Sequence, residues 1–210
     1  MSRPTQNIPR RSQAERSATT IANLIEATIA ALHEHGYAAT STSLVAKRAG
    51  VSRGAMLHHF PTKVQLMAAT VYAAYDQNID AYRQVLEVQG KLTERLDRLI
   101  DTAWTCFKSP SGIAETEIWM ATRSDVNLAA AVLPVHAAIV AQSAANLEEL
   151  IGDRIAGSGV TNTQILTYMV AALHGLALAH TLGTPQSDVD MAVSLIKKTV
   201  RSLVGLDAST

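Results

Sequence analysis

Residues 50–54 read Gly-Val-Ser-Arg-Gly, a short stretch whose chemistry depends on what surrounds it. It fits G-x-S-x-G, the pattern in which α/β-hydrolases place a nucleophilic serine on a sharp turn between a strand and a helix. It also fits a tight turn in which Ser52 caps the next helix, because a serine hydroxyl accepts hydrogen bonds from first-turn backbone N–H groups. Ser52 is therefore either a nucleophile or a helix cap, and its neighbours decide between the two.

The residues before Gly50 do not form the buried strand that a nucleophilic serine of this kind needs. Residues 44–49 read Leu-Val-Ala-Lys-Arg-Ala, a charged stretch that favours helix. A helix–turn–helix explains more of the sequence, because a small Ala46 lets a second helix cross closely, Gly50 permits a positive φ, and Met56 fills the core. We therefore interpret Ser52 as a helix cap.

The elements that must position this turn are all helical. Apolar residues recur at spacings of three and four along most of the chain, and no stretch shows a confident strand pattern, so we predict an all-α fold of about nine helices. Short helices flank Gly50, and Thr62 caps a long helix from Lys63. The other expected helices cover residues 17–36, 91–108, 113–122, 126–151 (with Pro134 inside), 163–182 and 188–206.

The charge of the chain is unevenly distributed, although the formal net charge is zero. Residues 1–63 carry eight Lys or Arg against three Asp or Glu, whereas residues 64–210 carry ten against fifteen. This asymmetry indicates that only the N-terminal part faces a polyanion. We expect a disordered basic arm at 1–16, a helix–turn–helix DNA-binding domain at 17–63 with its motif at about 42–61, and a ligand-binding and dimerisation domain at 64–210. The arm either lies along DNA or is an idle tail.

The cysteine count and the hydropathy of the chain indicate its cellular location. The single cysteine, Cys106, excludes an intrachain disulfide framework and suits a reducing cytoplasm; we interpret it as a small buried hydrophobe. No apolar run approaches the about 18 residues of a membrane span, and the polar N-terminus lacks the apolar core of a signal peptide. We therefore expect a cytoplasmic protein with no membrane partner, no cofactor and no metal site.

Residues 17–67 resemble the N-terminal domain of the TetR family of bacterial transcriptional regulators. The resemblance rests on HGYAATST at 35–42, VAKRAGVSRG at 45–54 and HFPTK at 59–63. The chain departs from the family at Met56-Leu57, where Leu-Tyr is usual, and Leu57 cannot hydrogen-bond a phosphate. The resemblance implies a helix–turn–helix domain on a larger helical domain, a homodimer on a palindromic double-stranded DNA operator, and release by a small-molecule effector. It also implies repression more often than activation.

The residues of the helix–turn–helix suit these roles. Arg53 can pair with guanine O6 and N7, and Ala55 leaves room for close approach to the bases. Hydroxyls and N–H groups at the start of the preceding helix can meet a phosphate. His59 matches the family's phosphate-binding histidine, with packing as the alternative. The residues expected to contact DNA are Thr42, Ser43, Ser52, Arg53, Ala55, Leu57, His58, His59 and Lys63.

The resemblance also places a ligand site between the middle helices of the larger domain. We expect its walls to be built from the few aromatic side chains of the chain and from flexible methionines, with a few polar residues. The alternative is that these side chains only pack in the core. The candidate ligand-binding residues are Tyr72, Tyr75, Trp104, Phe107, Trp119, Met120, Arg123, His136, Met169 and His174.

One recognition helix buries too little surface for useful selectivity, so we expect a dimer. The resemblance implies a four-helix bundle across a two-fold axis, built from the last two helices, and internal packing is again the alternative. The candidate interface residues are Ile165, Met169, Leu173, Leu176, Val193, Ile196 and Val200. The leading hypothesis is a ligand-responsive DNA-binding dimer; a serine hydrolase using Ser52 and a helical interaction protein without DNA affinity are the alternatives.

Overall fold

The computed structural model describes residues 12–155 and 159–206, and within them it consists of nine α-helices, one 3-10 turn and no strand. The predicted all-α class and helix number are confirmed for this part of the chain. Residues 1–11 of the predicted arm lie outside the described residues. Residues 13–16 are helical, contrary to the expected disorder, because Ser12 and Glu15 form a capping box at the start of the first helix.

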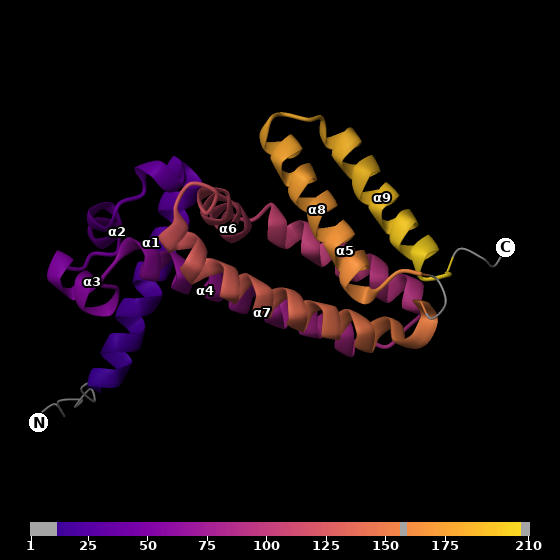
Figure 1. Cartoon of the computed structure of the whole chain (residues 1–210), viewed down its shortest axis with the longest axis horizontal. Coiled ribbons are helices and arrows are strands. Elements are labelled where there is room, and N and C mark those ends of the chain that lie inside the picture. The colour runs from indigo at the N-terminus through magenta and orange to yellow at the C-terminus, as the bar shows by residue number, and fades with distance from the viewer. Residues whose placement is uncertain (1–11, 156–158, 207–210) are drawn as a thin grey trace, which may run out of the picture.

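Three helices form one end of the molecule, at the left of Figure 1: α1 (Gln13–Ala39), α2 (Thr42–Arg48) and α3 (Arg53–His59). The helix α1 begins four residues before the predicted residue 17, because Ser12 is its N-cap. Its regular part stops at Gly36, which has a φ of +72°. The predicted stop at this glycine is confirmed.

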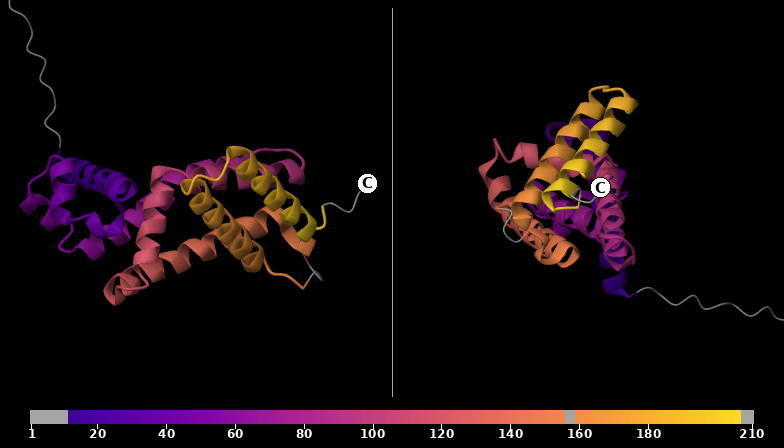
Figure 2. Two further views of the ribbon diagram at one scale, coloured as in Figure 1. Left: turned by 90° about the horizontal axis from the view of Figure 1, so that it is seen from above. Right: turned by 90° about the vertical axis from the view of Figure 1, so that its right-hand side faces the viewer.

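Two long helices run side by side away from that end, α4 (Lys63–Glu87) and α7 (Val126–Ile151). Between them in the sequence come α5 (Leu92–Phe107) and α6 (Pro110–Ala121), and η1 (Gly152–Ile155) follows α7. The last two helices, α8 (Asn162–Thr181) and α9 (Gln186–Leu203), form a hairpin. Figure 2 shows this hairpin well separated from α1–α3 along the long axis.

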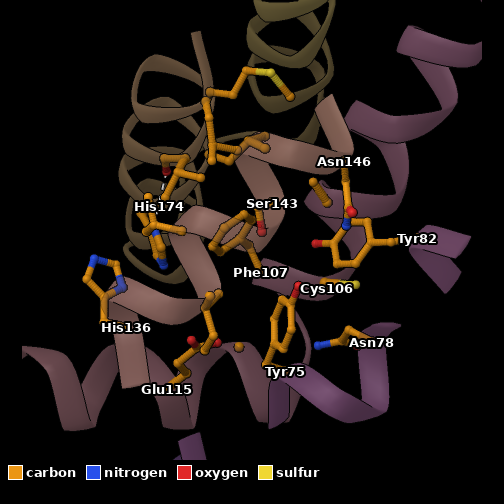
Figure 3. Close-up of a pocket in the computed structure, with 18 of the residues that line it drawn as sticks. Tyr75, Asn78, Tyr82, Cys106, Phe107, Glu115, His136, Ser143, Asn146 and His174 are labelled. Atoms are coloured by element: carbon orange, nitrogen blue, oxygen red, sulfur yellow. Dashed lines mark hydrogen bonds between the residues drawn. The ribbon is translucent and has the colours of Figure 1, made fainter. Parts of the chain in front are cut away.

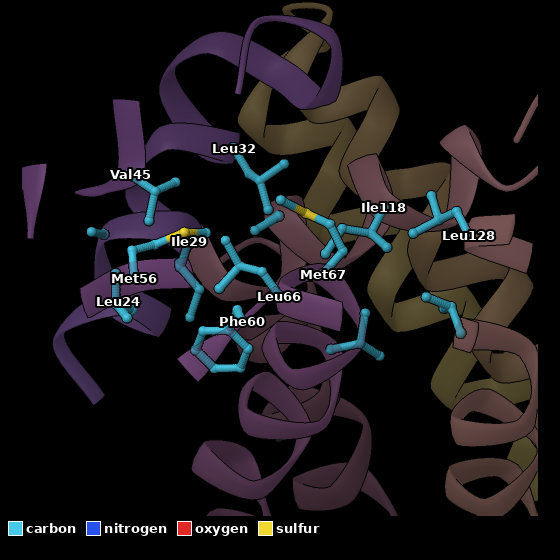
Figure 4. Close-up of a cluster of buried hydrophobic side chains, with 14 of the residues drawn as sticks. Leu24, Ile29, Leu32, Val45, Met56, Phe60, Leu66, Met67, Ile118 and Leu128 are labelled. Atoms are coloured by element: carbon cyan, nitrogen blue, oxygen red, sulfur yellow. The ribbon is translucent and has the colours of Figure 1, made fainter. Parts of the chain in front are cut away.

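The first hydrophobic core lies under α2 and α3 and is entirely apolar (Figure 4). It is not confined to the first three helices, because α4 crosses it and both α6 and α7 reach into it. Ile118 of α6 and Leu128 of α7 are fully buried there beside Met67 of α4. The helix–turn–helix therefore rests on the middle of the chain. Its fully buried large side chains are Leu24, Leu32, Val45, Met56, Leu66, Met67, Ile118 and Leu128.

The second hydrophobic core lies between α5, the C-terminal part of α7, α8 and α9. Its members repeat along each helix at spacings of three and four, so one face of each helix turns inward. Two ion pairs join α5 to α9 at the surface: Lys197 Nζ lies 2.6 Å from Asp101 Oδ1, and Arg201 Nη1 lies 3.1 Å from Asp97 Oδ2. The hairpin α8–α9 is thus fixed to α5 by apolar packing supported by surface charge.

The apolar character of α7 differs from what the sequence led us to expect. Residues Val126–Ile155 are long and apolar enough, by length and composition, to cross a membrane, with a mean hydropathy of 1.7. The expectation that no such run exists was wrong, because the many alanines of this stretch are apolar without being bulky. Only 11% of the apolar window is buried in the monomer. Its buried residues join both cores, Leu128 in the first and Leu147 in the second.

Candidate functional site

The turn between α2 and α3 has the geometry that its sequence predicts. Gly50 has a φ of +68°, and the N–H of Val51 donates to the Ala46 carbonyl at 3.0 Å. Ser52 is the N-cap of α3, and its Oγ accepts from the N–H of Ala55 at 3.1 Å. The helix cap is confirmed. The hydrolase alternative fails because a helix, not a strand, leads to Ser52 and its hydroxyl is used as a cap.

A single side chain anchors α3 to the body of the molecule. Met56 is fully buried in the first core, and Phe60 closes the end of the helix at 8% exposure. Arg53, Leu57 and His58 are exposed on the outer side of the helix. The remaining predicted DNA contacts on α3 are Ser52, which is exposed, and Ala55 and His59, which are partly buried.

The cap of the helix α2 is Ser41, whose Oγ accepts from the N–H of Leu44 at 3.2 Å. Thr42 and Ser43 therefore occupy its first turn, with Ser43 exposed and Thr42 partly buried. At the other end, Arg48 makes a two-pronged ion pair with Glu34 of α1, with Nη1 2.7 Å from Oε2. This pair holds α2 against α1 on the exposed surface.

Lys63, at the start of α4, has internal partners that the sequence did not reveal. Its Nζ donates to the Tyr37 carbonyl at 2.8 Å and lies 3.8 Å from the centroid of the Tyr37 ring. Partial burial lowers the pKa of Lys63 from its usual value. The N–H of Tyr37 donates to Glu117 Oε2 of α6 at 2.8 Å. The end of α1, the start of α4 and α6 therefore meet at Tyr37.

The seven residues predicted for the dimer interface point into the monomer instead. Ile165, Leu173 and Val200 have no exposed surface, and Met169, Val193 and Ile196 are at most 7% exposed. Leu176 is partly buried and packs against the same second core. This interface prediction was wrong, because both faces of α8 are apolar and periodicity alone does not show which one is turned inward.

A different apolar stripe lies on the outer side of the hairpin. On α8 the exposed residues 168, 171, 175 and 178 alternate spacings of three and four, and Leu182 continues this spacing at the C-cap of the helix. On α9, Met191 and Leu195 are 61% and 56% exposed. Leu178 and Leu182 are 61% and 78% exposed. Gly175 lies in the middle of this stripe, and no other atom lies within 4 Å of where its Cβ would be. We call this set the outer stripe of α8–α9.

A cavity of about 140 Å³ lies between α4, α5, α6, α7 and α8 (Figure 3). Most of its walls are apolar or aromatic. Polar groups come from Asn78, Ser143 and Asn146, and ionisable ones from two tyrosines, two histidines, Cys106 and Glu115. No lysine or arginine is among the described residues that line it.

Six of the ten candidate ligand-binding residues line this cavity, and the other four do not. Phe107, Trp119, His136, Met169 and His174 line it, as does Tyr75. Tyr72 and Met120 lie outside the cavity and are 62% and 57% exposed, and Arg123 is exposed as well. Trp104 also lies outside the cavity lining, buried in the second core with its ring 6.1 Å from that of His180.

The histidines of the cavity are neutral side chains packed against aromatic rings. The ring of His136 lies 3.9 Å from that of Trp119, and the ring of His174 lies 4.1 Å from that of Phe107. Burial lowers the pKa of both histidines. The Nδ1 of His174 lies 3.1 Å from the Val170 carbonyl, so this nitrogen is partnered. His136 Nδ1 and Trp119 Nε1 are buried with no hydrogen-bond partner among the described residues.

Burial shifts the acidic groups of the cavity toward their protonated forms. Burial raises the pKa of Glu115 to about 7. Burial also raises the pKa of Tyr82 well above its usual range, and that of the Cys106 thiol, with which Tyr82 shares a hydrogen bond. Cys106 is thus a free, partly buried thiol in an apolar wall, and a protonated thiol is a poor nucleophile.

Sequence reasoning missed Glu115, Tyr82 and the polar residues of α7. Glu115 had one usable signal, because it precedes Trp119 by four residues and therefore shares its helix face. The other residues had none, since they come from helices that are distant in the sequence. Glu117 was missed too, because its contact with Tyr37 joins residues 80 positions apart and leaves no signal in the local sequence.

Comparison with known proteins gives a family model and partial relatives. Residues 24–70 match the family described as bacterial regulatory proteins, tetR family. The HTH-type transcriptional regulator CymR of Pseudomonas putida is 40% identical over 98 residues, which are 47% of this chain and 48% of CymR. The HTH-type transcriptional regulator BetI of Escherichia coli is 36% identical over 80 residues, 37% of this chain and 41% of BetI. These matches span about half the length of the relatives, or less.

Solved structures match over nearly the whole chain. A transcriptional regulator from Rhodococcus sp. Rha1 has a TM-score of 0.72 at 20% identity, covering 87% of this chain and 96% of that one. A TetR family transcription regulator from Marinobacter aquaeolei VT8 has a TM-score of 0.67 at 22% identity, covering 89% and 97%. These likenesses show a shared fold. The helix–turn–helix region therefore matches the tetR family of bacterial regulatory proteins at residues 24–70, and the chain shares its fold with solved regulators along most of its length.

Proposed function

We propose that the protein is a transcriptional regulator that reads DNA with α3. The observation that carries this proposal is the way α3 is held: Met56 fixes it to the first core, Ser52 caps it, and Arg53, Leu57 and His58 remain exposed. A helix with one buried anchor and a free polar face is what major-groove recognition needs. Such a regulator acts on genomic DNA, so its place is the bacterial cytoplasm.

The other predicted contacts belong to the same proposal. Arg53 reads guanine, Ala55 allows close approach, and the first turn of α2, with Thr42 and Ser43, faces a phosphate. Leu57, at a position where the family usually has a tyrosine that contacts a phosphate, makes an apolar contact instead, for example with a thymine methyl group. His59 and Lys63 contact phosphates in this proposal; Lys63 Nζ donates one of its three N–H groups to the Tyr37 carbonyl, which leaves two for a phosphate.

Dimerisation through the outer stripe of α8–α9 completes the proposed DNA-binding unit. The stripe is apolar, sits on a hairpin at the end of the molecule remote from α3, and contains Gly175, whose open surroundings allow a partner helix to approach closely. A two-fold pairing of these hairpins makes a four-helix bundle and directs two copies of α3 to the two halves of a palindrome.

Replacing Leu178 and Leu182 by aspartate tests this pairing. The double variant should sediment as a monomer at micromolar concentration, because two charges would be buried in an apolar interface without partners. The control is Leu133→Asp on α7, a leucine of similar exposure (52%) outside the outer stripe, which should remain dimeric. A native protein that sediments as a monomer, or a double variant that stays dimeric, contradicts the pairing.

We also propose that a small molecule in the cavity weakens DNA binding, and that the protein is a repressor relieved in this way. The cavity shares α6 with the contact to the DNA-binding end: Glu115 lines the cavity, and two residues later Glu117 accepts from Tyr37. A ligand that binds better to one position of α6 shifts the population of that position, and with it the placement of α1.

The proposed function is tested by sequencing genomic DNA fragments that the purified protein selects. The expected result is a motif with two-fold symmetry and half-sites about one helical turn apart. A matched selection with Arg53→Ala, which removes the guanine contact, should lose the motif. Enrichment of no sequence by the native protein, or of the same motif by the variant, contradicts a reading role for α3.

A further inference from the structure

The residues that line the cavity between α4 and α8 favour one chemical class of ligand, which the proposed function does not specify. We infer that it binds a small organic amine of about one ring in size, whose ammonium group pairs with Glu115. The regulatory role of this ligand rests on the proposed function. The binding itself follows from the charges and unpaired atoms of the walls.

Glu115 is the one carboxyl among the described cavity residues, and no lysine or arginine lines the cavity beside it. A ligand carboxylate would therefore be buried without a counter-charge, which is costly. A ligand ammonium instead restores the ionised form of Glu115, whose burial raises its pKa to about 7. The walls thus favour a cation over an anion.

A second acceptor and two aromatic rings line the same cavity. Figure 3 shows Glu115 between His136 and Tyr75. Nδ1 of His136 has no hydrogen-bond partner among the described residues. In the neutral tautomer that carries its proton on Nε2, this nitrogen accepts, and an ammonium has three donors to share between it and the carboxylate. The rings of Tyr75 and Trp119, which also line the cavity, attract a cation through their faces.

The size of the cavity limits the rest of the ligand. About 140 Å³ is roughly ten times the smallest space that holds one water molecule. A ligand of about ten non-hydrogen atoms therefore fills it, which means one aromatic or aliphatic ring on a short chain. The apolar walls, with Phe107 and Leu173 among them, suit that ring.

Three probes of one shape separate the possibilities: 3-phenylpropylamine, 3-phenylpropan-1-ol and 3-phenylpropanoic acid. Their binding to the full chain is measured by calorimetry and by intrinsic tryptophan fluorescence, to which Trp119 in the cavity wall contributes, at pH about 7.5, where the amine is protonated. The amine should bind about ten-fold more tightly than the alcohol, because a charge-assisted hydrogen bond replaces a neutral one. The acid should bind most weakly.

Glu115→Gln keeps the shape of the side chain and removes its charge. The variant should bind amine and alcohol equally, with alcohol binding as in the native chain, which also shows that the cavity is intact. Glu148→Gln, an exposed glutamate on α7, is the matched control and should keep the amine preference. If Glu115→Gln does not fold, the native chain's ranking of the three probes still decides.

The inference is overturned if the native chain fails to bind the amine, or binds the alcohol or the acid as tightly. Persistence of the amine preference in Glu115→Gln overturns it as well. DNA binding is measured separately on selected fragments. Loss of the amine preference with DNA binding intact contradicts only this inference, whereas amine binding without any DNA binding contradicts only the proposed function.

Discussion

The core beneath α3 and the core between α5, α7, α8 and α9 differ in how the polar groups near them are hydrogen-bonded. Around the first, the buried Thr28 and Thr70 donate to carbonyls of their own helices at 2.7 and 2.8 Å, and none of the fully buried large side chains of that core lines the cavity between α4 and α8. The cavity borders the second core at Ala103, Leu147, Met169 and Leu173; in its wall, Trp119 Nε1 and His136 Nδ1 have no hydrogen-bond partner among the described residues, and Glu115 is partly buried.

This difference separates two tasks. A filled core with satisfied polar groups holds α3 in one position, which recognition of a fixed DNA surface needs. A core that keeps space and unpaired polar atoms is less stable by itself and gains from a ligand that supplies the missing partners. α6 belongs to both regions, since Ile118 lies in the first core while Glu115 lines the cavity.

The largest effect is expected from Met56→Ala in the first core. Met56 is fully buried, so its truncation should lower the free energy of unfolding by about 2–5 kcal/mol. Leu99→Ala on the cavity wall should cost clearly less, because Leu99 is only partly buried and already borders empty space. Urea denaturation followed by circular dichroism measures both, and equal losses would break the distinction between the two cores.

The next effect is a pH dependence from Glu115. Its pKa is about 7 in the folded chain against an ordinary 4.5, so the folded state binds more protons between these values. The free energy of unfolding should fall as the pH rises through this window, by up to about 3 kcal/mol from this group.

The two cavity histidines have the opposite sign. Burial lowers their pKa values, so the stability that they contribute is lost as the pH falls below 6.5. Comparing native protein with Glu115→Gln in urea at pH about 5 and about 8 isolates the glutamate. The variant should gain stability relative to the native protein at the higher pH, and a difference that does not change with pH would contradict the buried carboxyl.

The smallest effect is expected at the turn before α3. Gly50 has a φ of +68° and open space around its missing Cβ, so Gly50→Ala suffers only the backbone cost of the left-handed region, about 1–2 kcal/mol. Thermal unfolding should show this loss while the cavity still binds its probes. A stabilising substitution would contradict the assigned turn.

The sequence predicted the first region well and the second poorly, for a physical reason. The turn at Gly50, the cap at Ser52 and the anchor Met56 are set by neighbours within a few residues, so a local pattern reveals them. The cavity joins five helices, and whether Met120 or Trp119 faces it depends on packing angles that no local pattern contains.

The dimer residues failed for a related reason. The helix α8 is apolar on two faces, and burial of Ile165 and Leu173 against the second core left the outer stripe exposed. Periodicity finds a helix with two apolar faces but does not say which face α5 and α7 cover. Similarly, the early start of α1 followed from the reciprocal cap of Ser12 and Glu15, which outweighed the polar composition of that segment.

The central claim is that α3 reads base sequence, and the affinity of Arg53→Ala for selected and for random DNA tests it most directly. Fluorescence anisotropy on both duplexes, with the exposed Arg98→Ala of α5 as the matched control, gives the ratio of the two affinities. We predict that Arg53→Ala loses about 1–3 kcal/mol of preference for the selected duplex while Arg98→Ala loses none. Equal losses on both duplexes would mean that Arg53 touches only phosphate, and would contradict the account.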